Sequence, residues 1–186
     1  MKLIIGLGNP GKEYEKTNHN VGFRVIDEVV KNLDLCYEKK MICESEVAVY
    51  GIGENRIIFA KPMTYMNNSG LAVVKLVKKY NINPSTDLVI VADDFDTKEG
   101  TIRIREKSGN TTHNGIRSIK NELKTNEFIR FKVSIAPKPE YMSVVDYVLA
   151  RSTNPSIRAS EKLAVDALMD FVGGTELGIV MGKFSK

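Results

Sequence analysis

The stretch that decides the fold is Asp87-Leu88-Val89-Ile90-Val91-Ala92-Asp93-Asp94. Its apolar residues are consecutive rather than alternating, which is typical of a strand buried on both faces of a parallel sheet. The run ends on two carboxylates. Because open α/β sheets bind ligands at the carboxyl ends of their strands, Asp93 and Asp94 are in a favourable place for chemistry.

The rest of the chain alternates between strand and helix patterns. A second short apolar run, Lys2 to Leu7, enters a glycine-rich loop, and apolar residues recur at helical spacing from about Val21. Further strands are predicted at residues 47–49, 56–60, 101–105 and 128–136, and further helices at 70–80, 115–123, after a capping box at 143–146, and at 156–172. This order predicts one α/β domain over residues 1–186, a mixed twisted sheet with helices on both faces.

Length and composition favour a single globular unit. The chain has 186 residues, 42% of them hydrophobic and 27% charged, which is enough for one substantial core. Cys36 and Cys43 have no second ligand pair and are interpreted as free thiols. No apolar run is long enough to cross a bilayer, so we expect a cytoplasmic protein without a membrane partner.

Positive charge gathers in one part of the chain. Residues 101–139 hold nine basic and three acidic side chains, although the net charge of the whole chain is only +4. Such an uneven distribution favours a phosphate-rich partner bound on one face. A set of solvated surface lysines and arginines is the alternative.

The loop Gly6-Leu7-Gly8-Asn9-Pro10-Gly11 matches the pattern of a dinucleotide-binding loop. In that motif a helix starts on the glycines and meets the pyrophosphate. Here Pro10 and a polar segment postpone the helix by about ten residues. We therefore expect no nucleotide cofactor.

The two histidines are the best candidates for proton transfer. His19 and His113 are each followed by asparagine, and imidazole titrates near neutral pH. His19 shares its loop with Asn9 and Tyr14, and Asp93 supplies a carboxylate that can orient the ring. A structural histidine that caps the following helix is the alternative.

Two other polar segments allow different interpretations. In the stretch from Lys61 to Gly70, Asn68 or Ser69 caps a helix, but Asn67 exceeds what one cap needs. The aspartates at 93, 94 and 96 are an alternative magnesium site for phosphoryl chemistry. No close spacing of histidines and aspartates supports that metal site, so we expect none.

Four motifs together closely resemble the bacterial peptidyl-tRNA hydrolase family. They are Gly6-Leu7-Gly8-Asn9-Pro10-Gly11 with Tyr14 and Thr17-Asn18-His19-Asn20-Val21-Gly22; Lys61-Pro62, Thr64 and Met66-Asn67 with Ser69-Gly70; Asp93-Asp94-Phe95-Asp96; and His113-Asn114-Gly115 with Ser118-Ile119. The resemblance extends over essentially the whole chain and is strongest up to about Ile119.

The resemblance implies a monomeric, metal-independent and cofactor-free hydrolase. Its partner is peptidyl-tRNA, whose ester it cleaves to recycle tRNA from abandoned translation. His19 is implied as the general base and Asp93 as the carboxylate that orients it. The resemblance further implies substrate binding by Asn9, Tyr14, Met66, Asn67 and Asn114, and tRNA binding by Arg103, Arg105 and Lys132.

The chain departs from the family where glycines are usual. The stretch Ser108-Gly109-Asn110-Thr111-Thr112 precedes His113, and the β-branched Thr111 and Thr112 are expected to stiffen or reshape this loop. Lower tRNA affinity is one expected consequence. A tRNA- or RNA-binding protein that has lost turnover is therefore a second functional class, and a magnesium-dependent phosphodiesterase is a third.

Overall fold

The computed structural model describes residues 1–107, 109 and 111–186. Within these residues a six-stranded sheet has the order β2-β3-β1-β4-β6-β5. The strands are β1 Lys2–Gly6, β2 Ser45–Tyr50, β3 Ile57–Pro62, β4 Leu88–Asp94, β5 Ile102–Lys107 and β6 Glu127–Ser134. The four central strands run parallel, and the edge strands β2 and β5 pair antiparallel. The predicted mixed α/β sheet is confirmed.

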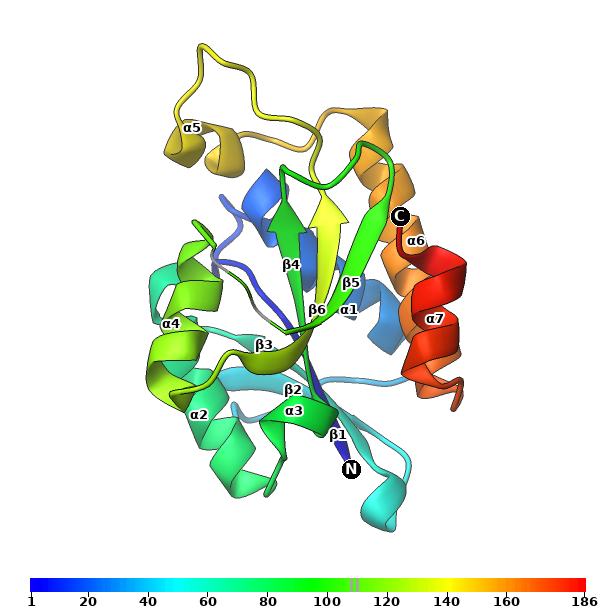
Figure 1. Cartoon of the computed structure of the whole chain (residues 1–186). Coiled ribbons are helices and arrows are strands. Elements are labelled where there is room, and N and C mark those ends of the chain that lie inside the picture. Colours follow the sequence, from blue (N-terminus) through cyan, green and yellow to red (C-terminus); the bar gives the residue numbers. More distant parts are fainter. Residues whose placement is uncertain (108, 110) are drawn as a thin grey trace.

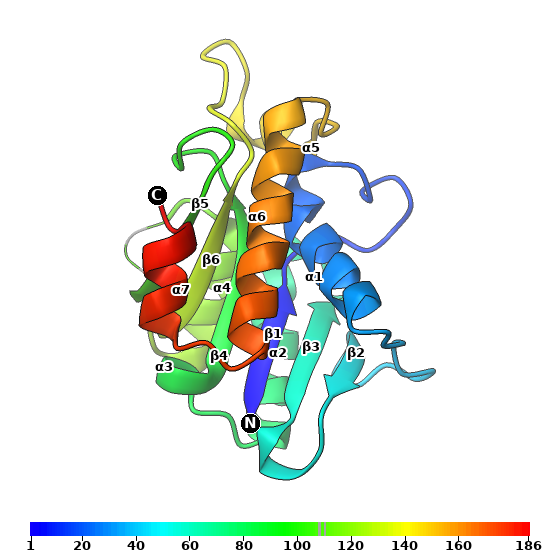
Figure 2. The same ribbon diagram turned by 90° about the vertical axis from the view of Figure 1, so that its right-hand side faces the viewer.

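Helices cover both faces of the sheet (Figure 1). They are α1 Val21–Asn32, α2 Ser69–Lys79, α3 Pro84–Asp87, α4 Asn114–Leu123, α5 Val144–Leu149, α6 Pro155–Val172 and α7 Leu177–Phe184. Helices α2 and α4 pack together on one side, and Figure 2 shows α1, α6 and α7 on the other. Short 3-10 turns, η1 Asn18–Asn20, η2 Gly53–Asn55 and η3 Met66–Asn68, complete the described structure. No described helix has the length and apolarity of a membrane span.

The core forms two layers because neighbouring strand residues point to opposite faces. Ile4, Val89 and Val91 belong to the cluster under α1 and α6. Ile5 and Ile90 belong to the cluster under α2 and α4. Strand β4 is buried on both sides, as its uninterrupted apolar sequence predicted.

Glycines bring the first turn of α1 against the sheet. A Cβ atom on Gly22 would lie 2.4 Å from the Val91 carbonyl oxygen and 2.6 Å from the Leu7 nitrogen. Only glycine therefore fits, and the loop before α1 is held beside the end of β4. The glycine pattern that resembles a nucleotide-binding loop serves this close packing, with Gly8 lying against the Phe23 ring.

Most predicted elements are confirmed, with shifted ends. Strand β5 extends to Lys107 rather than Arg105, and β6 ends at Ser134 rather than Ala136. The Ser143 cap is present, since its hydroxyl accepts from the Asp146 backbone N–H at 3.1 Å. Helices α3 and α7 are not predicted from the sequence. Helix α3 has only one turn, and α7 is interrupted by glycines that obscure its periodicity.

Candidate active site

Three segments far apart in the sequence meet at the carboxyl end of β4. Turn η1 presents His19, Asp93 is the next-to-last residue of β4, and His113 directly precedes α4. All three side chains line a cavity of about 340 Å³, together with Asn114 and Lys132. The predicted convergence of His19 and Asp93 is thus present in the structure.

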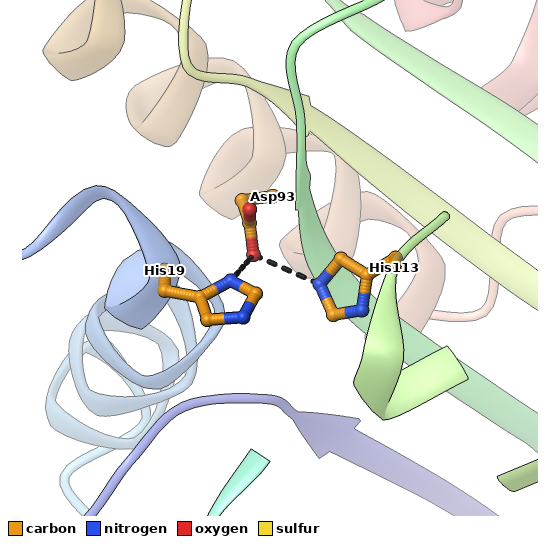
Figure 3. Close-up of side chains that lie close together, drawn as sticks. All are labelled: His19, Asp93 and His113. Carbon is orange, nitrogen blue, oxygen red and sulfur yellow. Dashed lines mark hydrogen bonds and ion pairs between the residues drawn. The ribbon is translucent and has the colours of Figure 1, made fainter. Parts of the chain in front are cut away.

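One carboxylate oxygen joins the two imidazoles (Figure 3). Asp93 Oδ1 lies 2.7 Å from His19 Nδ1 and 2.9 Å from His113 Nε2. The Asp93 side chain is 2% exposed, and the His19 and His113 side chains are 10% and 11% exposed. The other ring nitrogen of His19 points away from Asp93 (Figure 3).

The electrostatics favour an ionised Asp93. Burial raises the pKa of its carboxyl, but the charges and hydrogen bonds of His19 and His113 lower the pKa by more, well below its usual range. An ionised carboxylate only accepts hydrogen bonds, so both ring nitrogens that face it carry protons. Nδ1 of His19 is therefore the N–H donor, and Nε2 keeps a free lone pair.

The same neighbours make His19 a stronger base. Burial lowers the pKa of His19, while the charge of Asp93 and its hydrogen bond raise it. The net pKa lies above the ordinary value of 6.5. A neutral imidazole with a raised pKa is well suited to take a proton from water near neutral pH.

Among the described residues, His19, Asp93 and His113 form the one group that could hold a metal ion. Their ligand atoms lie within 4.8 Å of one another. Two protons already join these atoms at hydrogen-bond distances. A metal bound by these three atoms would have to replace both protons. Asp94, which the magnesium alternative also uses, is paired with Lys132 and accepts from the Thr97 hydroxyl.

Asn9 is held in one orientation. Its side-chain oxygen accepts from the Met66 backbone N–H at 2.8 Å, and its backbone N–H and carbonyl bond the Asn20 side chain, each at 2.9 Å. The Asn9 amide NH₂ therefore points away from these bonds, and no described residue accepts from it. Asn20 was missed as a positioning residue. Its position beside His19 was the only signal in the sequence.

A strained residue orients the Met66 N–H. Tyr65 has φ of 63° and ψ of 155°, a backbone conformation that residues other than glycine rarely adopt. Its exposed ring meets the Tyr14 ring edge to face, with centroids 6.4 Å apart. Met66 is buried, and its sulfur would lie 2.5 Å from a Cβ atom on Gly115. Tyr14, Met66 and Asn9 are thus linked to the start of α4.

The other predicted substrate-binding residues are less enclosed. Asn114 is exposed and lines the same cavity as His19, whereas Asn67 is exposed on η3 outside that lining. Asn9 lines a separate cavity of about 520 Å³ with Asn20 and Lys61. The structure thus brings Asn114 next to the histidine pair and places Asn9 and Asn67 on adjoining segments.

The predicted tRNA-binding residues lie on the edge strand β5 and on its neighbour β6. Arg103 pairs in register with Lys132, and Arg105 with Arg130. Lys132 lines the cavity and bonds Asp94 at 3.0 Å, while Arg105 is exposed and bonds only its neighbour's carbonyl among the described residues. Thr111 and Thr112 line the cavity as well, whereas Ser108 and Asn110 of that loop lie outside the described residues.

Arg130 is a second residue that sequence reasoning left without a role. It lines the cavity, is 8% exposed, and its Nε atom has no hydrogen-bond partner in the described chain. Its place in the basic segment was the available signal, but an alternating strand pattern does not distinguish a buried arginine from an exposed one.

Comparisons with known proteins identify the family of the chain. The family model described as peptidyl-tRNA hydrolase matches residues 3–183. The crystal structure of peptidyl-tRNA hydrolase from Acinetobacter baumannii has 27% identity and a TM-score of 0.87, covering 98% of this chain and 93% of that one. Its Arg119Gln mutant is 28% identical, with the same TM-score and the same coverage of both chains. A 5'-methylthioadenosine nucleosidase from Arabidopsis thaliana, at 8% identity and a TM-score of 0.54, covers 96% of this chain and 98% of its own. It shares the fold alone.

Proposed function

Because the chain belongs to the peptidyl-tRNA hydrolase family, we propose that it hydrolyses the ester between a peptide and the terminal ribose of tRNA, and that His19 activates the water. Because released tRNA returns to translation, we also propose that the protein works in the cytoplasm and as a monomer. The observation that carries the proposed mechanism is the 2.7 Å bond from His19 Nδ1 to Asp93, with the opposite ring nitrogen left for substrate.

The reaction needs one proton transfer in each direction. Nε2 of His19 takes a proton from water as the oxygen attacks the ester carbonyl carbon. The Asp93 carboxylate stabilises the imidazolium that forms. This imidazolium then returns the proton to the ribose oxygen when the ester bond breaks, which leaves a free carboxylic acid and a free hydroxyl.

Asparagine side chains supply the neutral donors. As the carbonyl oxygen gains negative charge, the Asn9 amide NH₂ stabilises it, because its oxygen is already held by the Met66 N–H. Asn67 and Asn114 bind the peptide backbone, and Tyr14 and Met66 shape the cleft. These steps use only side chains of the chain itself and water.

A peptide-release assay tests the proposed function against its alternatives. Incubated with peptidyl-tRNA, the protein should release peptide and leave the tRNA at full length. A phosphodiesterase would shorten the RNA, and a binding protein without turnover would shift the tRNA in a gel without releasing peptide. Either of these results would overturn the proposed function.

Asn9→Asp tests the oxyanion donor. The carboxylate keeps an oxygen for the Met66 N–H but replaces the NH₂ donor with an acceptor. We expect kcat to fall by about 10²- to 10³-fold, the usual effect of losing one such donor. Asn68→Asp is the matched control, because Asn68 lies on the same turn as Met66 with an exposed side chain. Equal kcat values for Asn9→Asp and wild type would remove Asn9 from the mechanism.

Arg105→Glu tests the tRNA surface. The Arg105 side chain is exposed and bonds only the Ile104 carbonyl among the described residues, so the fold should tolerate the change. A charge-assisted contact contributes about 1.5–3 kcal/mol, so KM for peptidyl-tRNA should rise about tenfold or more. KM for a small ester substrate should stay unchanged.

The control for Arg105→Glu is Lys31→Glu, which makes the same change in net charge on α1, a helix that packs over β1, β3 and β4. If Arg105→Glu raises KM equally for both substrates, or no more than Lys31→Glu, Arg105 does not bind tRNA. Lys132→Gln is the second variant. It avoids placing a new carboxylate beside Asp94, the present partner of Lys132.

A further inference from the structure

Both ring nitrogens of His113 make hydrogen bonds within the protein. Nε2 lies 2.9 Å from Asp93 Oδ1, and Nδ1 accepts from the Ile116 backbone N–H at 3.3 Å as the N-cap of α4. A backbone N–H requires an unprotonated acceptor, so the proton of the neutral ring is on Nε2. His113 thus donates to the same oxygen that accepts from His19.

The location of His113 connects these two bonds to substrate binding. The residue directly precedes Asn114, the first residue of α4 and part of the cavity lining. Its ring lies 4.9 Å from the His19 ring, centroid to centroid, at an angle of 49°. Asp93 comes from β4, so His113 connects the end of the sheet to the start of the helix that presents Asn114.

We propose that His113 is a positioning residue with two separable tasks. Its Nε2–H holds the Asp93 carboxylate toward His19, and its Nδ1 fixes the first turn of α4 and with it Asn114. This inference rests on the proposed function, because the positioned groups are those that would activate water and bind the peptide. His113 itself does not touch the reacting atoms.

The shared oxygen also sets how strongly Asp93 holds the His19 proton. Two donors divide the electron density of one carboxylate oxygen. Without the His113 donor, Asp93 accepts from His19 alone and stabilises its imidazolium more. The acid limb of kcat/KM, the part of its pH profile that rises as His19 loses its proton, should then have its midpoint at higher pH. The other titratable or charged side chains of the cavity and of the two helices that pack against η1 are unchanged by such a substitution. They are Asp94, Asp96, Arg130 and Lys132 of the cavity, Arg24 of α1, and Asp146 and Tyr147 of α5.

Two substitutions separate the tasks. In His113→Asn the short carboxamide keeps an oxygen near the place of Nδ1 and caps the helix, but it is too short to reach Asp93. In His113→Gln the longer side chain places its NH₂ near the position of Nε2, while it is a poor cap. Each variant thus keeps one of the two bonds of the imidazole.

We expect opposite effects from the pair. His113→Asn should keep the wild-type Tm. It should lower kcat about 10- to 100-fold because Asp93 is less well placed. The midpoint of the acid limb should rise by a few tenths of a pH unit. His113→Gln should lower Tm by about 2–4 °C through loss of the cap and keep the midpoint of the acid limb. NMR titration of His19 in each variant gives the same midpoints without substrate.

The outcomes that contradict the inference are specific. If His113→Asn keeps the wild-type kcat and midpoint, His113 is only a helix cap. If both variants lose Tm and kcat in parallel with unchanged midpoints, its role is purely structural. If the wild-type protein releases no peptide, the proposed function fails first, whereas the NMR midpoints still show whether His113 and His19 share Asp93.

Discussion

His19→Ala is expected to lower kcat/KM for peptidyl-tRNA by about 10²- to 10⁴-fold, the usual contribution of a general base. The His19 ring lines the cavity, and its Nδ1 bond to Asp93 leaves the lone pair on Nε2. Without it, water must attack without an acceptor for its proton. Peptide release under single-turnover conditions measures this loss without interference from product release.

Two controls accompany this prediction. Hydrolysis of a small ester should slow by the same factor as hydrolysis of peptidyl-tRNA, because the base acts on the water and not on the tRNA. Arg105→Glu, by contrast, should affect peptidyl-tRNA only. Binding of tRNA should stay within about twofold of wild type. If His19→Ala retains the wild-type rate of peptide release while circular dichroism shows a native fold, His19 is a structural residue.

Asp93→Asn should reduce kcat by a similarly large factor, about 10²- to 10⁴-fold, by analogy with the loss of the orienting carboxylate in serine hydrolases. The carboxamide is close in shape to the carboxylate but has no charge to stabilise an imidazolium. It can also present its NH₂ to His19, which would reverse the ring's proton arrangement.

The pH dependence of Asp93→Asn has a definite sign. In the proposed mechanism the neutral form of His19 is the base, so activity should rise as pH increases through its pKa. Burial lowers the pKa of His19, and Asp93 raises it by more. In Asp93→Asn the residue at position 93 has no charge, so only the effect of burial remains and the acid limb moves to lower pH. His113→Asn should move it in the opposite direction, so the two variants test the shared carboxylate independently. An acid limb that stays in place in Asp93→Asn would show that Asp93 does not set the basicity of His19.

The contact between His19 and Asp93, the proposed catalytic pair, could be predicted from sequence for a geometric reason. Asp93 ends an uninterrupted apolar strand, and His19 follows the loop of another such strand, Lys2 to Leu7. Parallel neighbours end at the same edge of the sheet, so their terminal residues meet. The apolar spacing from about Val21 likewise predicted α1, which packs its apolar face on the sheet.

What the sequence did not reveal depends on contacts between distant segments. His113 was recognised as a candidate for proton transfer, but its bond to Asp93 depends on where the loop before α4 crosses the end of β4. The buried state of Arg130 depends on the edge strand β5 beside it. The bond from Met66 N–H to Asn9 requires a backbone conformation at Tyr65 that no residue pattern predicts.

Lower tRNA affinity through Thr111 and Thr112 stays a prediction. Both threonines line the cavity with His113. Branched side chains restrict the backbone and occupy space near the proposed path of the RNA. This expectation concerns binding, and it leaves the chemistry of His19 unaffected.

The most direct test of the central claim is a ¹⁵N NMR titration of the imidazole nitrogens. The chain has only two histidines, and His113→Asn assigns the two sets of signals. Neutral His19 should carry its proton on Nδ1, and its titration midpoint should lie above 6.5 and coincide with the midpoint of the acid limb of kcat/KM. A neutral His19 protonated on Nε2, or a midpoint unrelated to the kinetic limb, would contradict the central claim.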